Sequence, residues 1–473
     1  MIDTTPGLSA RAAVTWVRRH TPGEWHESPQ PLPADHIAAD FARRYAGIPA
    51  NSLARNEPIV CYQAEGRSIP VLLGLYGSDE RVRSWLPGLP HPVDRPNAES
   101  LLAKAMPPVI VETPVCRQRI HSRVDLSRLP ALRATPRDAG PYLTTGVVMA
   151  GAPGATETSL SVHRMLLIGR NKLAIWMVPG RAVRRLHEAA LLTGRRLPVS
   201  VNIGAPPAAV VASALSSAVL PADVDKLHIA GAMAERPISI AHALTQPVSV
   251  LAESEIVLEG YLDNTVADEA LSGPPDVSLP EFLGYDGTAQ PNLPVLTVTA
   301  MTTRRSPRFQ AVIGPGREQS VILGLAGAIS VALTGNDNDW RMIRDLHYSP
   351  AGGGMLLLTV AVRKESSADD ERLGAIARRI FEWHTFVKLI IFTDTDVDIT
   401  SAEDVLWAIT TRANLNTDCA TFAGFRPLAM DPSHRADWSD QRGANGGAGR
   451  TYLDATVPYA LRAQTMRSFG EQS

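Results

Sequence analysis

The spacing of apolar residues divides the chain into stretches of different character. Near the N-terminus, a helical pattern at 35–43 and an apolar run at 69–75 predict one helix and one buried strand. A short helical segment at 99–106 ends at Pro107–Pro108, and paired prolines interrupt regular elements. We therefore expect an N-terminal α/β domain over residues 1–115.

Residues 116–316 are dominated by short β-branched and apolar runs that turn residues separate. The runs that predict strands are 147–149, 165–168, 173–178, 199–203, 238–240 and 295–298. The turn Gly169–Arg170–Asn171 predicts a hairpin between its neighbours. Helical spacing appears mainly at 182–193 and 208–217. Many short strands with few helices favour a barrel or a sandwich-like core.

From residue 317 onward, helices and strands alternate. The elements predicted there are helices at 319–333, 368–385 and 402–411 and strands at 355–362 and 389–392. This alternation is typical of an α/β domain, which we place at 317–430. Residues 431–473 are rich in Gly, Asp, Ser and Arg, and we expect them to form a tail or an arm lying on a neighbouring chain. The whole pattern predicts an α+β multidomain protein.

Composition narrows the class of protein. At 473 residues the chain exceeds what one hydrophobic core usually supports. Hydrophobic residues make up 45% and charged residues 20%, which is ordinary for a soluble globular protein. A formal net charge of −2 gives no electrostatic signature of binding to nucleic acid or to an anionic membrane.

Cysteine usage and the N-terminus indicate a compartment. Cys61, Cys116 and Cys419 lie far apart and in no metal-binding spacing, which fits a reducing environment and excludes a disulfide scaffold. Asp3 and its polar neighbours do not resemble a signal peptide. No apolar run approaches the roughly 20 residues that a membrane span requires. We expect a soluble, cytoplasmic protein.

Common catalytic motifs are missing from the sequence. It contains no GxxxxGK[ST], no GxGxxG that opens a helix, no HExxH, no GxSxG and no CxxC. What remains is Arg164 in a predicted hairpin, directly after His163, and two acids five positions apart, Asp276 and Glu281. An arginine on a strand is most often part of a structural ion pair, and acids in a Pro-rich loop are most often solvated. These residues alone leave the type of enzyme open.

Several blocks of the sequence resemble the UbiD-type decarboxylases, which use prenylated FMN. Residues 161–165 resemble the hairpin that carries the family's catalytic arginine, and 198–207 resemble its strand and G-x-x-P turn. Residues 252–260 resemble its most diagnostic stretch. Further similar blocks follow the family's order at 125–130, 138–142, 404–412 and 453–456.

The resemblance implies a split β-barrel at 116–316 that binds the flavin, and a C-terminal domain that forms homodimers or homohexamers. It implies non-oxidative decarboxylation of an α,β-unsaturated, aromatic or heteroaromatic acid through an adduct with prenylated FMN. A flavin prenyltransferase would supply this cofactor, or unmodified FMN would bind. High Ala and Arg usage favours a GC-rich bacterial genome and a role in secondary metabolism. The alternative is a non-catalytic or flavin-independent homologue that serves as a binding or scaffold subunit.

The resemblance also implies an acid–arginine–acid network beside the flavin. Arg164 would hold the substrate carboxylate, and Glu281 would be the general acid that protonates the carbon that lost CO₂. Asp276 would tune the pair, because two carboxylates near one arginine do not ionise independently. A second register of the family's E-G-P-x-G-[ED] loop matches Ser272–Gly273–Pro274 and leaves Ser272 at the acid position.

Further positions would hold the cofactor. Val162 and His163 would offer backbone groups to the isoalloxazine, and the turn Ser216–Ser217 would contact the flavin. Lys388, ahead of a predicted strand, would reach the phosphate.

The family's metal ligands are altered in this sequence. Its Asn position is Ser159, its His position falls on Gly180 or Arg181, depending on the register, and its Glu position is Lys226. A divalent cation prefers oxygen ligands with negative charge, and Lys226 or Arg181 would repel it.

Two interpretations of these changes stay open. In the first, Arg181 and Lys226 contact the flavin phosphate and replace the charge of the metal. In the second, cofactor binding is lost or the pocket serves other chemistry. We favour the first, because Arg164 and at least one acid are present. A third possibility is a metal ligand from elsewhere, such as His187 or His228.

Overall fold

The computed structural model describes residues 5–45, 57–151, 158–270, 277–281, 284–314, 316–335, 338–428, 430–435, 448–465 and 467. Contacts divide the chain into two compact units. The first consists of Met1–Leu89 and Lys104–Ile322, and the second of Pro90–Ala103 and Leu323–Ser473. Apart from Lys388, every described residue that is predicted to bind substrate or flavin belongs to the first unit.

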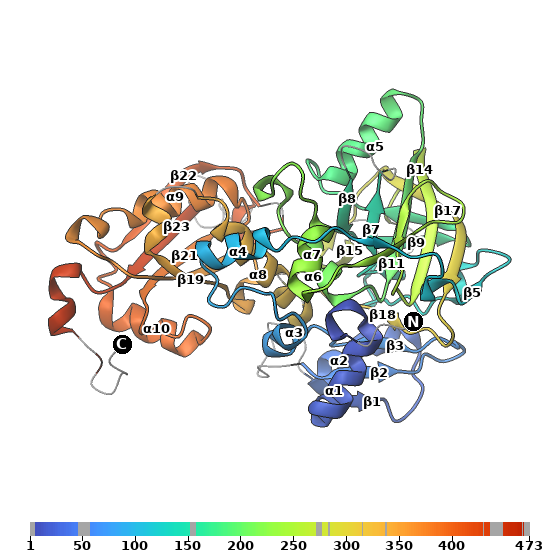
Figure 1. The fold of residues 1–473 in the computed structure, drawn as a ribbon, viewed down its shortest axis with the longest axis horizontal. Helices are drawn as coiled ribbons and strands as arrows, with labels where there is room; N and C mark the ends of the chain where they lie inside the picture. Colours follow the sequence, from blue (N-terminus) through green and yellow to red (C-terminus); the bar gives the residue numbers. More distant parts are fainter. Residues whose placement is uncertain are drawn as a thin grey trace. The chain divides into compact units, whose positions relative to one another are not determined.

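A curled antiparallel sheet forms the centre of the first unit (Figure 1). Within the described residues it has nine strands, in the order β6-β9-β10-β17-β14-β11-β7-β8 with β5 paired to β17. Their bounds are β5 Arg119–Ile120, β6 Tyr142–Leu143, β7 Val147–Ala150, β8 Ser159–Val162, β9 Met165–Gly169, β10 Lys172–Ile175, β11 Leu197–Ile203, β14 Ile256–Ala267 and β17 Leu293–Thr303. The predicted hairpin at 169–171 is confirmed, because β9 and β10 pair antiparallel on either side of it.

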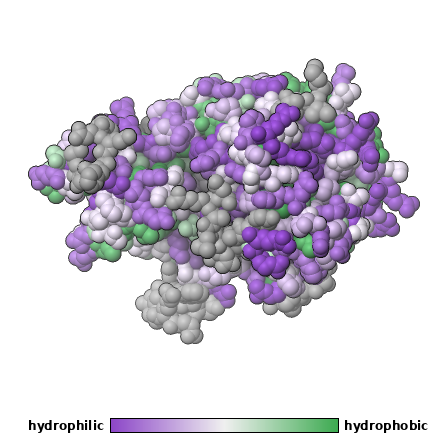
Figure 2. Space-filling model, turned by 90° about the horizontal axis from the view of Figure 1, so that it is seen from below, coloured by the Kyte–Doolittle hydropathy of each residue, from purple (hydrophilic) through white to green (hydrophobic). Residues whose placement is uncertain are grey.

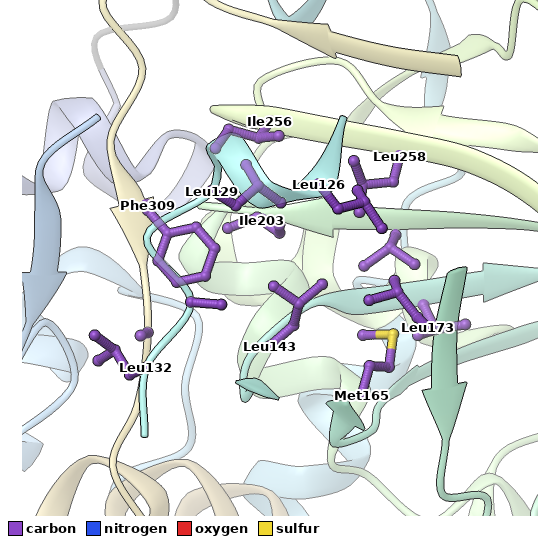
Figure 3. Close-up of a cluster of buried hydrophobic side chains, with 14 of the residues drawn as sticks. Leu126, Leu129, Leu132, Leu143, Met165, Leu173, Ile203, Ile256, Leu258 and Phe309 are labelled. Carbon is purple, nitrogen blue, oxygen red and sulfur yellow. The ribbon is translucent and has the colours of Figure 1, made fainter. Parts of the chain in front are cut away.

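Alternation along β9 sends side chains to two different apolar clusters. Met165 points into the large core, together with the other labelled residues of Figure 3. Leu166 points to the opposite side, into a smaller cluster with Tyr142 and Leu279. Because successive strand residues face opposite sides of a sheet, Arg164 shares the side of Leu166.

Smaller sheets surround this centre. The sheet β1-β2-β3-β18 consists of β1 Trp25–Glu27, β2 Ile59–Tyr62, β3 Val71–Leu73 and β18 Phe309–Gln310, and α2 Ala34–Tyr45 packs on it. The other strands are β4 Val109–Ile110, β12 Ser239–His242 and β13 Ser249–Leu251, in one sheet, and the hairpin β15 Val277–Pro280 with β16 Asp286–Thr288. Most of the segment expected as a separate N-terminal domain, 1–115, thus packs in the same unit as the central sheet.

The helices of this unit are short. They are α1 Ala10–His20, α2, α3 Asp79–Trp85, α5 Ala182–Leu192, α6 Pro207–Ser213 and α7 Lys226–Ala234. The helix predicted at 182–193 is confirmed, whereas that at 208–217 ends at Ser213 and gives way to a 3₁₀ turn at Ser217–Val219. At the start of α7, Asp225 accepts hydrogen bonds from the backbone of Leu227 and His228.

The second unit is built on a sheet in the order β19-β20-β21-β23-β22. Its elements are β19 Ile343–Tyr348, β20 Leu357–Val362, β21 Leu389–Asp394, β22 Cys419–Phe425, β23 Ala448–Ala455, α4 Arg95–Ala103, α9 Leu373–Trp383 and α10 Ala402–Arg412. After contributing α4, the chain returns to this unit within α8 Arg317–Ala332. Strands β20, β21 and β23 are parallel, as the predicted α/β alternation indicates.

The interpretation of 431–473 as a tail is wrong for residues 448–455. These residues form β23, which pairs with β21 on one side and β22 on the other. Polar residues such as Arg450 and Thr451 obscured the strand, although Arg450 is buried within it. The Gly-rich residues 436–447 lie outside the described part of the chain.

The coarse prediction of a mixed α/β protein with more than one domain is confirmed. No helix in the described part of the chain is long and apolar enough to cross a membrane. Figure 2 shows a face on which hydrophilic residues predominate and hydrophobic residues form small separate patches.

Candidate active site

Arg164 lies between two glutamates in the first unit. Its Nε and Nη2 donate hydrogen bonds to Oε1 and Oε2 of Glu269 at 3.0 and 2.9 Å. Its Nη1 donates to Oε1 of Glu281 at 2.6 Å. The pairing with Glu269 has the two-point geometry that an arginine fork favours, so one cation fixes two acids in place.

Glu269 is the fully buried acid, with a side chain that is 0% exposed. The hydroxyl of Tyr142 donates to its Oε1 at 3.1 Å, and the backbone N–H of Gln290 donates to its Oε2 at 3.0 Å. Burial, and then the negative charge of Glu269, raise the pKa of Tyr142 well above its ordinary value. Tyr142 therefore stays protonated and remains a donor.

Glu281 is the accessible acid, with a side chain that keeps 25% of its exposure. It follows β15, and its backbone N–H donates to the carbonyl of Tyr285 at 2.8 Å. A Cβ atom at Gly287 would lie 2.9 Å from Glu281 Oε1, closer than real Cβ atoms approach oxygen. Glycine at 287 thus leaves the room in which the Glu281 carboxylate lies.

An aromatic ring lies beside the cation of this network. The Cζ atom of Arg164 is 5.7 Å from the centroid of the Trp176 ring, within the range of a cation–π contact. Trp176 also packs against the small apolar cluster that contains Leu166. The cation of Arg164 therefore adjoins an apolar, aromatic surface.

His163 connects this network to β8. Its Nδ1 is 3.0 Å from the carbonyl oxygen of Trp176, and its Nε2 is 2.8 Å from Ser161 Oγ, which lies 3.2 Å from Ser159 Oγ. Burial lowers the pKa of His163 to about 4, and the nearby charge of Arg181 acts in the same direction. A neutral ring that donates from Nδ1 and accepts at Nε2 fits both contacts.

The charges of two cations, Arg181 and Lys226, act on His163. The Nζ of Lys226 donates to the carbonyl oxygens of Leu160, at 3.2 Å, and Ser213, at 2.8 Å. Burial lowers the pKa of Lys226 to about 7, and repulsion by Arg181 contributes. In the described part of the chain, no carboxylate pairs with Lys226 or Arg181.

The residues at the family's metal positions do not fit a divalent ion. Ser159 bonds to a neighbouring hydroxyl, and Arg181 and Lys226 are cations. Over the described ranges, no three His, Cys, Asp or Glu side chains form a group that could hold a metal ion. The donor set that a hard cation needs is therefore absent from this cluster of described residues.

The remaining predicted residues have different surroundings. Asp276 lies outside the described residues. Lys388 belongs to the second unit, where its Nζ donates to Asp431 Oδ2 at 2.6 Å and to Ser433 Oγ at 2.5 Å, so its contact with a flavin phosphate stays a prediction. Ser216 and Ser217 follow α6, close in sequence to the carbonyl that Lys226 binds, and Val162 ends β8 with 36% exposure.

Glu269 is the functional candidate that sequence analysis missed. The search for a second acid assumed a separation of five residues from Glu281, and Glu269 is more distant along the chain. The available signal was its place directly after the segment that forms β14, where the acids Asp268 and Glu269 follow the last strand residue, Ala267.

Two family models match the sequence. Residues 109–318 match the 3-octaprenyl-4-hydroxybenzoate carboxy-lyase Rift-related domain, UbiD. Residues 323–455 match the 3-octaprenyl-4-hydroxybenzoate carboxy-lyase C-terminal domain.

Proteins of known activity are similar over much of the chain. Gallate decarboxylase of Lactiplantibacillus plantarum is 31% identical over 337 residues, which cover 71% of this chain and 69% of that protein. Anhydromevalonate phosphate decarboxylase of Methanothermobacter thermautotrophicus is 26% identical over 423 residues, which cover 88% of this chain and 93% of that protein.

Solved structures share the fold. Apo 3,4-dihydroxybenzoic acid decarboxylase of Klebsiella pneumoniae superposes with a TM-score of 0.89 at 28% identity, over 98% of each chain. The UbiD-class enzyme HmfF of Pelotomaculum thermopropionicum, solved in complex with FMN, gives a TM-score of 0.81 at 24% identity, over 98% of this chain and 97% of that one.

Proposed function

Because this chain belongs to the UbiD family of carboxy-lyases, we propose that it decarboxylates an aromatic acid of the hydroxybenzoate kind. The relatives named for gallate and 3,4-dihydroxybenzoate support this substrate class over other unsaturated or heteroaromatic acids. The observation that carries the proposal is the arrangement Glu269–Arg164–Glu281 beside the ring of Trp176.

Arg164 would hold the substrate carboxylate. Among the described residues, four of its five N–H groups donate to Glu269, Glu281 and the carbonyl of Thr288, which leaves one N–H on Nη1 for a substrate oxygen. Glu269, with no exposure, balances the charge of Arg164 and fixes its orientation. A flat substrate ring would then lie against apolar surface near Trp176.

Glu281 would deliver the proton. When the bond between the ring carbon and the carboxylate breaks, CO₂ leaves and the ring carbon must accept a proton in its place. Protonated Glu281 gives that proton and becomes a carboxylate beside Arg164, which stabilises it. Since Glu281 is partly exposed, it regains a proton from water before the next turnover. Asp276 would modulate this exchange.

The residues present fit the phosphate of a flavin, since Lys226 beside β8 and Arg181 near it have no carboxylate partner among the described residues. Prenylated FMN, or FMN, would supply the electron sink for the bonding pair that CO₂ leaves behind. Val162 and His163 would face the isoalloxazine, and Ser216–Ser217 would lie near the phosphate. The curled sheet would then be a split β-barrel.

Wider features of the family extend the proposal. A flavin prenyltransferase would supply the modified cofactor, and the second unit would join copies of the chain into a homodimer or homohexamer in the cytoplasm. The alternative of a non-catalytic scaffold is less well supported, because the charged network retains both an accessible acid and a buried one.

A turnover assay tests the proposed activity. The protein, co-expressed with a flavin prenyltransferase, is incubated with gallate, 3,4-dihydroxybenzoate and cinnamate, and products are separated by liquid chromatography. We expect the phenols pyrogallol or catechol from the first two acids, and loss of product with Glu281→Gln. A flavin-loaded protein that converts none of the three acids would contradict the proposal.

A further inference from the structure

We propose that Arg181 and Lys226 form a metal-free site for the terminal phosphate of the flavin, so that this enzyme binds its cofactor without a divalent ion. The inference rests on the proposed function, because it takes a flavin as the anionic ligand. It goes further by assigning the positive charge of the phosphate site to two side chains of this protein.

Each of these cations stands at the start of a helix. Arg181 is the N-cap residue of α5, and Lys226 is the first residue of α7. The first N–H groups of a helix lack partners within it and carry partial positive charge, which attracts anions. The uncapped helix end at Arg181 and the two cationic side chains therefore favour the same kind of ligand.

The N-terminus of α5 has no side-chain cap, whereas that of α7 is capped by Asp225. Asp225 already accepts from the first amides of α7. Arg181 makes no side-chain cap, and within the described residues the amides of Ala182 and Val183 donate to no acceptor. An anion beside Arg181 would satisfy these donors.

Among the residues that the structure describes, no carboxylate pairs with either of the two cations. Lys226 is half-buried, and its Nζ has only the carbonyl oxygens of Leu160 and Ser213 as described partners. Its lowered pKa shows that burial and Arg181 both disfavour its charged form. Asp225 is adjacent in sequence, but its carboxylate bonds to the backbone of α7 and to the ring of His228. An anion that binds between two such cations offsets their repulsion and so lowers the free-energy cost of holding them close together.

The same arrangement explains why a metal is not needed. The Lys226 ammonium donates to two backbone oxygens, the kind of atoms that would otherwise line a cation site. Arg181 is exposed along its side chain and accessible to a ligand. Arg181 and Lys226 carry two positive charges when protonated, as many as a divalent ion would bring.

The test is binding of FMN to the full-length, flavin-free protein, followed by quenching of flavin fluorescence. We expect the same Kd, within about twofold, in EDTA and in excess MnCl₂. Lys226→Gln and Arg181→Gln should each weaken FMN binding about tenfold or more, since a charge-assisted hydrogen bond contributes about 1.5–3 kcal/mol. The two substitutions should change the Kd of riboflavin little, because riboflavin lacks the phosphate.

Two further variants serve as controls. Lys172→Gln removes an exposed lysine from β10 of the same unit and should leave FMN binding unchanged. Lys226→Arg keeps the charge and should restore part of the affinity, which separates loss of charge from misfolding.

The outcomes separate this inference from the proposed function. FMN binding that needs Mn²⁺, or that Lys226→Gln leaves unchanged, would overturn the metal-free site while decarboxylation could still be observed. Metal-independent binding without turnover of any aromatic acid would support the site and contradict the proposed reaction. A protein that binds no FMN in either buffer would overturn both.

Discussion

The guanidinium of Arg164 binds both carboxylate oxygens of Glu269, at 3.0 and 2.9 Å, and thereby ties the end of strand β14 to the start of β9. On its other side, the guanidinium donates one hydrogen bond of 2.6 Å, from Nη1 to Glu281 Oε1. One arginine thus has a buried partner and a partner that solvent can reach.

Replacing Glu281 should affect the reaction rather than the fold. Glu281→Gln removes the proton donor but keeps a group of the same size, so kcat should fall about 10²-fold or more while KM changes little. Steady-state kinetics on 3,4-dihydroxybenzoate would measure both parameters. Unchanged kcat would exclude Glu281 as the general acid.

Replacing Glu269 should affect the fold. Glu269→Gln leaves Arg164, whose side chain is 12% exposed, without its main counter-ion. Removing one partner of a buried ion pair costs about 3–5 kcal/mol, so the free energy of unfolding should fall by about that amount. Urea unfolding measures it, with Glu281→Gln as the matched control of smaller effect. If the two variants were equally stable, Glu269 would not be the main buried counter-ion of Arg164.

Gly287 should be sensitive to a single methyl group. In Gly287→Ala the new Cβ would lie 2.6 Å from the carbonyl oxygen of Leu279 and 2.9 Å from Glu281 Oε1, so both the hairpin and the carboxylate must shift. We expect kcat to fall about tenfold or more, because proton transfer depends on placement within a hydrogen-bond distance. Gly23→Ala, where no atom lies within 4 Å of the new Cβ, is the control and should be silent.

FMN affinity should fall as the pH rises above about 7. In the flavin-free protein the pKa of Lys226 is lowered to about 7, and a bound phosphate would raise that pKa. Above pH 7, FMN binding must therefore be accompanied by uptake of a proton, and the affinity decreases with each further pH unit. Below about 6, phosphate loses its second charge, which also weakens binding. FMN titrations from pH 5.5 to 9 should show the highest affinity between about pH 6 and 7. In Lys226→Gln the affinity should no longer fall as the pH rises above about 7.

Stability should respond to a second pair of acids, Glu57 and Glu318. Burial raises the pKa of Glu57 to about 8, with repulsion by Glu318 second, and burial raises the pKa of Glu318 to about 7. Since both folded-state pKa values exceed the unfolded ones near 4.5, the folded protein holds more protons and its stability decreases from about pH 4.5 to 8. Glu57→Gln should raise the Tm at pH 8 and change it little at pH 5. A variant that is equally destabilised at both pH values would contradict this assignment.

The sequence predicted correctly those elements whose signal lies within a few consecutive residues. The turn at Gly169–Asn171 specifies its hairpin, and the apolar spacing at 402–411 specifies α10. The pairing of Arg164 with Glu281 followed from resemblance to a family. Glu269 could not be placed in this way, because its contact with Arg164 depends on how β14 aligns with the strands around it. Likewise, β23 was missed because its strand character comes from neighbours on both sides.

The pairing of β18 with β3 has a consequence for the order in which the protein forms during synthesis. Phe309 and Gln310 complete a sheet whose other strands end at Leu73, so that sheet stays unfinished until more than half of the chain has left the ribosome. Contacts of such long sequence separation form slowly, because a large loop must close first. Nascent chains that stop before residue 309 should therefore expose the edge of β3 and depend on chaperones to avoid aggregation.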